Sequence, residues 1–144
     1  MNIQGVTHWS IPVKDLTESE RFYRDILGLE YRGRLGNSGM ACVVAGDSSI
    51  LLCEEPGTVR PSGENWNGAG VHHSFHMSAP DWEEGVRRLH ENNVQVLDLV
   101  YREKGHFPGR EVYFLDPSGN VLELRDPSWT PGAPKPTLDE ITAR

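Results

Sequence analysis

The chain has 144 residues, 24% of them charged, and a formal net charge of -7 at pH 7. This length fits one domain with a real hydrophobic core. The acidic balance argues against nucleic acid and anionic membrane surfaces as partners, because both require clustered lysine and arginine. No apolar run approaches the roughly 20 residues needed to cross a bilayer, and the N-terminus lacks a signal-peptide pattern, so we expect a soluble cytoplasmic protein.

The first half of the chain is predicted to form a strand, a helix and three more strands. Residues 5–13 alternate between polar and apolar side chains, and His8 and Ser10 share the polar face. The pattern Thr17-x-x-Glu20 is typical of a capping box and opens a helix that runs to about Leu27. Short strands separated by glycine-rich turns follow at 30–34, 40–44 and 49–54.

The same order of elements recurs in the second half. A loop at 56–69, rich in Gly, Pro, Asn and Ser, carries Trp66 and separates the halves. After it the patterns predict a strand, a helix and three further strands, at 70–77, 78–93, 94–100 and within 106–124.

The repeat predicts an α+β fold of two βαβββ modules. The modules span about 5–55 and 70–127, and their mostly antiparallel sheets are expected to fold toward one another as a cup with the helices outside. These modules make one domain, residues 1–127. The proline-rich stretch 128–144 has little periodicity and is interpreted as a tail that wanders or lies over a neighbour.

Pairing the two modules brings metal-type side chains to matching places. His8 and His72 have the same spacing to the apolar residues that follow them, so they occupy equivalent positions on equivalent strands. In that register His72, with Ser74 and His76, faces the concave side, and its neighbour His73 faces the helix.

Glu123 completes the set, because alternation puts it on the same side as Tyr113. Pairing the modules sets Leu52 against Glu123 as an apolar fourth corner. Taken singly, a strand histidine is more often packed and a glutamate more often a surface charge. Jointly, two imidazoles and a carboxylate suit Fe(II), Mn(II), Zn(II), Co(II) or Ni(II), with positions left open for a substrate.

At these residues the chain resembles the vicinal oxygen chelate superfamily, which includes glyoxalase I, fosfomycin-resistance enzymes, bleomycin-resistance proteins and type I extradiol dioxygenases. The resemblance covers about residues 5–127 and rests on GVTHWSIPVKDLTESERFYRDILGLE, GVHHSFHM and VYFLDPSGNVLELRDP. It implies paired βαβββ modules around one divalent metal, with His8, His72 and Glu123 as ligands. It also implies a homodimer.

The most specific match is to the extradiol dioxygenase signature, which here runs from His106 through Tyr113 to Glu123. It implies a ring-cleaving enzyme in which Fe(II) is favoured and binds a catecholate and O2. His106 or His76 then moves the substrate proton, and Tyr113 donates a hydrogen bond. The expected contacts with a small, aromatic substrate are Ser10, Ser74, Leu52 and Trp66.

Two other functions stay open. One is a metal-dependent lyase, isomerase or thiol transferase of the glyoxalase or fosfomycin-resistance type, which uses the metal without O2. Ser10 and Tyr113 match the fosfomycin-resistance pattern, and Arg125 is the one candidate for the cationic side chains that a phosphonate requires. The other is a metal-free protein that binds or sequesters a small molecule, in which the histidines hydrogen-bond within the cup.

Overall fold

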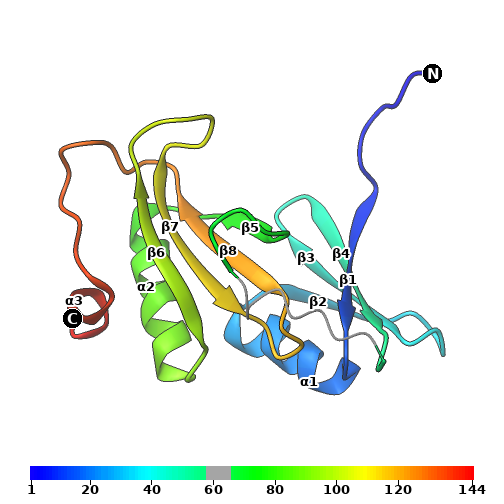
Figure 1. Ribbon diagram of the computed structural model, residues 1–144. Helices are drawn as coiled ribbons and strands as arrows, with labels where there is room; N and C mark the ends of the chain where they lie inside the picture. The colour runs from blue at the N-terminus through cyan, green and yellow to red at the C-terminus, as the bar shows by residue number, and fades with distance from the viewer. Residues whose placement is uncertain (58–65) are drawn as a thin grey trace. The chain divides into compact units, whose positions relative to one another are not determined.

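The computed structural model describes residues 1–57 and 66–144 (Figure 1). The chain divides into two compact units, Met1–Arg60 and Pro61–Arg144. Most of the loop predicted at 56–69 therefore lies outside the described residues. No helix in the described part of the chain is long and apolar enough to cross a membrane.

The first unit has the predicted βαβββ order. Its strands form one sheet in the order β1-β4-β3-β2, in which β1 and β4 run parallel and the other neighbours antiparallel. Its elements are β1 (His8–Val13), α1 (Leu16–Arg21), the π-helical turn η1 (Phe22–Ile26), β2 (Glu30–Arg34), β3 (Met40–Ala45) and β4 (Ser48–Glu54).

The start of the first helix differs from the predicted capping box. The Asp15 side chain accepts a hydrogen bond from the Glu18 backbone N–H at 2.8 Å, so Asp15 is the N-cap in place of Thr17. Glu20 pairs with Arg34 at 2.6 Å on β2 instead of reaching back to the helix start. The helix begins at Leu16, so Thr17 already lies inside it and Asp15 is the residue placed to cap the first N–H groups.

The second unit repeats the order. Its sheet runs β5-β8-β7-β6, with β5 and β8 parallel and the other neighbours antiparallel. The α-helix α2 lies against this sheet (Figure 1), and the Trp82 indole N–H donates to the Leu124 carbonyl oxygen at 2.9 Å. The elements are β5 (His73–His76), α2 (Ala79–Glu91), β6 (Val96–Arg102), β7 (Gly109–Leu115), β8 (Val121–Asp126) and α3 (Leu138–Thr142).

The ladders in the two sheets correct the predicted pairing of the modules by one residue. Ser10 pairs with Leu51 in the first sheet, and Ser74 pairs with Glu123 in the second. Leu51, not Leu52, is therefore the counterpart of Glu123. A shift of one residue turns a side chain to the other face of the sheet. Leu52 therefore lies on the face opposite to the one predicted.

Leu52 is wrong as a substrate contact. It pairs with Ile11 and is fully buried, at 0% exposure, among apolar side chains on the face of the sheet that α1 covers. The match between Glu55-Pro56 and Asp126-Pro127 misplaced the register, because Pro56 follows Leu51 by five residues and Pro127 follows Glu123 by four.

The stretch after residue 127 is not a free tail. Trp129 is 7% exposed, and its indole N–H donates to the Pro134 carbonyl oxygen at 3.0 Å. Ile141 is fully buried, and α3 packs beside α2 (Figure 1). A Thr137–Glu140 capping box starts α3. The many prolines suggested a tail, but Trp129 and Ile141 are buried, so this stretch packs against its own module.

Candidate active site

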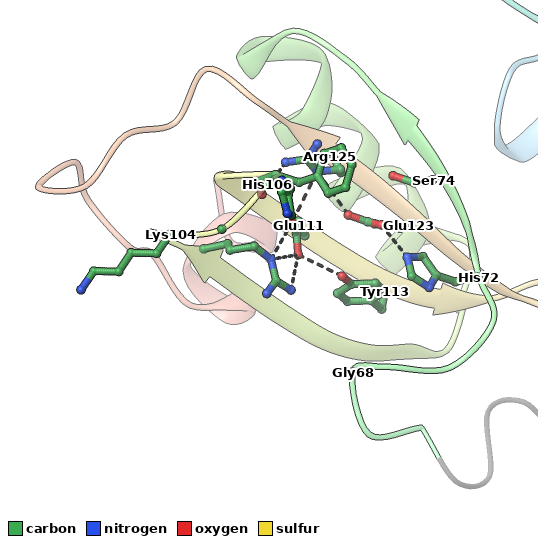
Figure 2. A pocket seen from close by; sticks show the side chains of 12 residues that line it. Gly68, His72, Ser74, Lys104, His106, Glu111, Tyr113, Glu123 and Arg125 are labelled. Atoms are coloured by element: carbon green, nitrogen blue, oxygen red, sulfur yellow. Dashed lines mark hydrogen bonds and ion pairs between the residues drawn. The ribbon is translucent and has the colours of Figure 1, made fainter.

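A pocket opens on the face of the second sheet that α2 does not cover, with a cavity volume of about 410 Å³. Twelve residues line it (Figure 2), from strands β5 to β8, from the loop between β6 and β7, and from the segment that leads into β5. They are Gly68, His72, Ser74, Arg102, Lys104, Gly105, His106, Phe107, Glu111, Tyr113, Glu123 and Arg125.

Two neighbouring strands supply the polar floor of this pocket. Alternation along β7 puts Glu111 and Tyr113 on the pocket face, and alternation along β8 puts Glu123 and Arg125 there. The ladder sets Glu111 opposite Arg125 and Tyr113 opposite Glu123. The intervening residues, such as Val112, are buried on the other face. Directly opposed pairs of this kind are in contact across a sheet, so the floor is a preformed polar array.

His72 and Glu123 form the part of this array with metal-ligand character. The His72 Nδ1 atom lies 2.8 Å from the Gly70 carbonyl oxygen, which can only accept, so Nδ1 carries the proton. The Nε2 atom lies 3.1 Å from the Glu123 Oε2 atom (Figure 2). When neutral, this imidazole offers Nε2 as a metal ligand, and the carboxylate beside it is a second ligand type.

Burial and neighbouring charge tune Glu123. The residue is 3% exposed, and desolvation raises the pKa of its carboxyl, with the nearby Glu111 charge adding to the rise. A hydrogen bond with Ser74 and the His72 and Arg125 charges lower the same pKa in part. A buried carboxylate with a raised pKa gains from a cation that replaces its lost hydration.

The Glu111 carboxylate contacts three other pocket side chains, those of Arg102, Tyr113 and Arg125. It accepts from Arg102 Nη2 at 3.0 Å and from the Tyr113 hydroxyl at 2.9 Å. Arg125 Nε lies 3.4 Å from an oxygen of Glu111 and 3.4 Å from an oxygen of Glu123. Desolvation, followed by the hydrogen bond to Glu111, raises the pKa of Tyr113 to about 12, so this phenol is neutral near pH 7.

The aromatic neighbours hold His72 and Tyr113 in place. The Trp66 ring lies 5.5 Å from the His72 ring and 4.9 Å from the Tyr113 ring, measured between centroids. His72 and Tyr113 meet edge to face at 5.6 Å. Trp66 thus supports the site as a packing partner of two pocket residues.

Apart from Leu52 and Trp66, described above, the predicted site residues fall into three groups. Five of them line this pocket: His72, Ser74, His106, Tyr113 and Glu123. His76 is exposed on β5 and is not among the lining residues.

His8 and Ser10 form the third group, on the polar face of β1 in the first unit. Among residues 1–57 and 66–144, no group of three or more His, Cys, Asp or Glu side chains that could hold a metal ion comes together. His8 as the third ligand stays a prediction from the sequence.

Four pocket residues were missed or undervalued in the sequence: Arg102, Lys104, Glu111 and Arg125. Glu111 stands two residues before Tyr113, so the alternation that selected Tyr113 also selects Glu111. Arg102 and Lys104 extend the basic set beyond Arg125, although Figure 2 shows the Lys104 side chain directed away from the other sticks. A charged residue in a short strand is expected to face solvent as long as the strand that pairs with it is unknown.

The sequence matches the Glyoxalase/Bleomycin resistance protein/Dioxygenase superfamily over residues 5–124. The chain belongs to this superfamily, which confirms the predicted membership and the fold of two βαβββ modules. A glyoxalase/dioxygenase from Nostoc punctiforme shares the fold with a TM-score of 0.71 and 25% identity, over 87% of this chain and 92% of that one. The fosfomycin resistance protein FosX from Listeria monocytogenes superposes with a TM-score of 0.69 and 21% identity, over 86% and 91%.

Curated relatives narrow the comparison to enzymes. The glutathione transferase FosA from Serratia marcescens is 30% identical over 124 residues, which cover 85% of this chain and 80% of the relative. The metallothiol transferase FosB from Staphylococcus epidermidis is 31% identical over 126 residues, covering 86% and 82%. These relatives support the prediction of an enzyme. The reaction in their names is the alternative of thiol transfer and not the ring cleavage that the sequence placed first.

Proposed function

We propose that this protein is a metal-dependent transferase that joins a thiol to a small electrophilic substrate, with His8, His72 and Glu123 as the metal ligands. One observation carries the proposal: the Nε2 atom of His72 lies 3.1 Å from the buried carboxylate of Glu123. The names of FosA and FosB support the thiol, and a FosX structure from Listeria monocytogenes holds Mn(II) with 1S,2S-dihydroxypropylphosphonic acid.

The donor set fits a borderline divalent ion. Imidazole nitrogen and carboxylate oxygen suit Mn(II), Zn(II), Ni(II), Co(II) or Fe(II). The Gly70 carbonyl oxygen accepts from His72 Nδ1 and so orients the ring, as carbonyl groups behind metal-bound histidines commonly do. A metal held there supplies Lewis acidity to a substrate oxygen. The third ligand, His8, is the one that the family resemblance implies.

The fixed charges in the pocket favour an anionic or oxygen-rich substrate only when the ion is present. The carboxylates of Glu111 and Glu123 balance the guanidinium groups of Arg102 and Arg125. A divalent ion leaves an excess of positive charge, so substrate oxygens are attracted to that end of the pocket.

The proposed reaction balances without an oxidant. The thiol proton passes to the His106 imidazole as the sulfur lone pair forms a bond to the electrophilic carbon. The carbon–oxygen bond breaks, its electron pair stays on the oxygen, and that oxygen takes up the proton. Tyr113 keeps its own proton near pH 7, so its phenol orients a group and does not serve as the base.

A product assay tests this function. Purified protein with Mn(II), Zn(II), Ni(II) or anaerobic Fe(II) is incubated with glutathione or cysteine and with either fosfomycin or glycidol, and products are followed by NMR. We expect a thiol adduct with at least one metal, lost in Glu123→Gln. A folded, metal-loaded protein that forms no adduct with either epoxide contradicts the proposal.

Ring cleavage is the second candidate, because His106, Tyr113 and Glu123 of the dioxygenase signature line one pocket. A catechol panel with O2 uptake, run on the Fe(II)-loaded protein, separates the two enzymes. O2 uptake with a ring-cleaved product and no thiol adduct favours the dioxygenase. Metal-independent binding without turnover favours the sequestering protein. The aromatic substrate, the homodimer and the preference for iron remain predictions.

A further inference from the structure

A buried acidic side chain occupies the floor of the pocket where oxyanion-binding groups gather. Glu111 is 1% exposed, and the side chains around it are two arginines and a tyrosine. Arginine and tyrosine are the groups that bind phosphate and carboxylate oxygens best. In this pocket the Glu111 carboxylate occupies the position next to these groups that the oxyanion of a ligand would take.

Glu111 accepts hydrogen bonds from both Arg102 and Tyr113. The Arg102 Nε and Nη2 atoms donate to the Glu111 carboxylate at 3.1 Å and 3.0 Å. Tyr113 donates its only proton to the same carboxylate at 2.9 Å. The Tyr113 oxygen therefore presents lone pairs to the pocket and no hydrogen, because a phenol has a single O–H donor.

Arg125 is held in the same way. Its Nη2 donates to the carbonyl oxygens of Phe107 and Pro108 at 2.8 Å and 2.9 Å, and its Nε lies between Glu111 and Glu123. Both guanidinium groups are thus balanced by charge from within the protein. An oxyanion beside Tyr113 meets a lone pair and the Glu111 charge instead of a donor.

We propose that Glu111 determines substrate specificity: it makes the Tyr113 end of the pocket an acceptor site that takes a hydroxyl, amine or thiol and excludes oxyanions. The anionic oxygens of a substrate are then restricted to the metal end. This inference goes beyond the transfer reaction, and it is tested without metal or thiol, so the two stand or fall separately.

The test measures binding of inorganic phosphate to the full chain in EDTA, by calorimetry or 31P NMR. In Glu111→Gln the neutral amide releases the Arg102 donors and frees Tyr113 to donate, so we expect phosphate to bind about tenfold tighter or more than in wild type. Adding Tyr113→Phe to this variant is expected to cancel part of the gain.

Two controls keep the test sharp. Glu84→Gln removes one negative charge from an exposed pair with Arg87 on α2 and is expected to leave phosphate binding unchanged. Tyr113→Phe alone is also expected to leave it unchanged, which tests the idea even if Glu111→Gln does not fold. The inference is overturned if folded Glu111→Gln binds phosphate as wild type does, if Glu84→Gln gains as much, or if Tyr113→Phe alone weakens phosphate binding.

Discussion

Replacing His72 by alanine is expected to weaken divalent metal binding by on the order of 100-fold or more, because loss of even an outer partner of a metal site costs 10- to 100-fold. His72 is the imidazole whose Nε2 faces Glu123. The hydrogen bond from His72 Nδ1 to the Gly70 carbonyl oxygen leaves Nε2 as the ring nitrogen that can coordinate a metal. Titration with Mn(II), followed by calorimetry or electron paramagnetic resonance, measures the loss.

The neighbouring histidine is the matched control. His73 pairs with Leu122, while Ser74, the next residue, pairs with Glu123, so His73 belongs to the opposite face of β5. We expect His73→Ala to bind Mn(II) within a few-fold of wild type. If His73→Ala loses the metal and His72→Ala retains it, the assignment of the strand faces is wrong.

The largest expected loss of stability comes from Arg110→Ala, at roughly 3–5 kcal/mol. Arg110 is buried on the helix side of the second sheet and pairs with Asp126, itself 1% exposed, at 2.8 Å. It also pairs with Glu83 at 3.0 Å and lies 4.4 Å from the centroid of the Trp82 ring. Truncation leaves the Asp126 carboxylate buried with less compensation. Urea unfolding measures the change.

Acid dependence gives this prediction a second readout. Burial alone would raise the pKa of Asp126, but hydrogen bonds from Ser128 and Arg110 outweigh it and lower that pKa below 3.8. The stabilisation is therefore present above the unfolded-state pKa and is lost as the pH falls through the lower folded-state pKa. We expect Arg110→Ala to lose less stability than wild type on acidification.

Arg87→Ala is the comparison for Arg110→Ala. Arg87 pairs with the exposed Glu84 on α2 at 2.9 Å, and such a pair contributes about 1 kcal/mol or less. Equal losses in the two variants would contradict the role assigned to the buried pair.

The order of the elements could be predicted from the sequence because the local signals agree with the tertiary structure. Alternation in β1, β7 and β8 reports their buried faces, and Gly28 ends the first helical segment at a φ of +73°. Two local predictions were wrong because another residue nearby had the stronger effect. Asp15 replaced Thr17 as the N-cap, and the apolar anchors Trp129 and Ile141 outweighed the prolines around them.

The candidate site was predictable where it depends on one strand and hidden where it depends on pairing. Alternation alone distinguishes His72 from His73 and places Tyr113 beside Glu123. The role of Glu111 requires knowing that β7 and β8 set it opposite Arg125 and that β6 brings Arg102 alongside. The error at Leu52 has the same origin, because the register depends on strand pairing, which a match between two dipeptides after the strands does not report.

The proposed metal centre needs one ligand from each module, and His8 is the residue that tests this. The decisive measurement is the metal content and Mn(II) affinity of the full chain, purified anaerobically, as wild type and as His8→Ala. We predict one divalent ion per chain in the wild type and its loss in His8→Ala. A wild-type chain that binds no divalent ion, or a His8→Ala chain that binds it with unchanged affinity, contradicts a centre shared by the two modules.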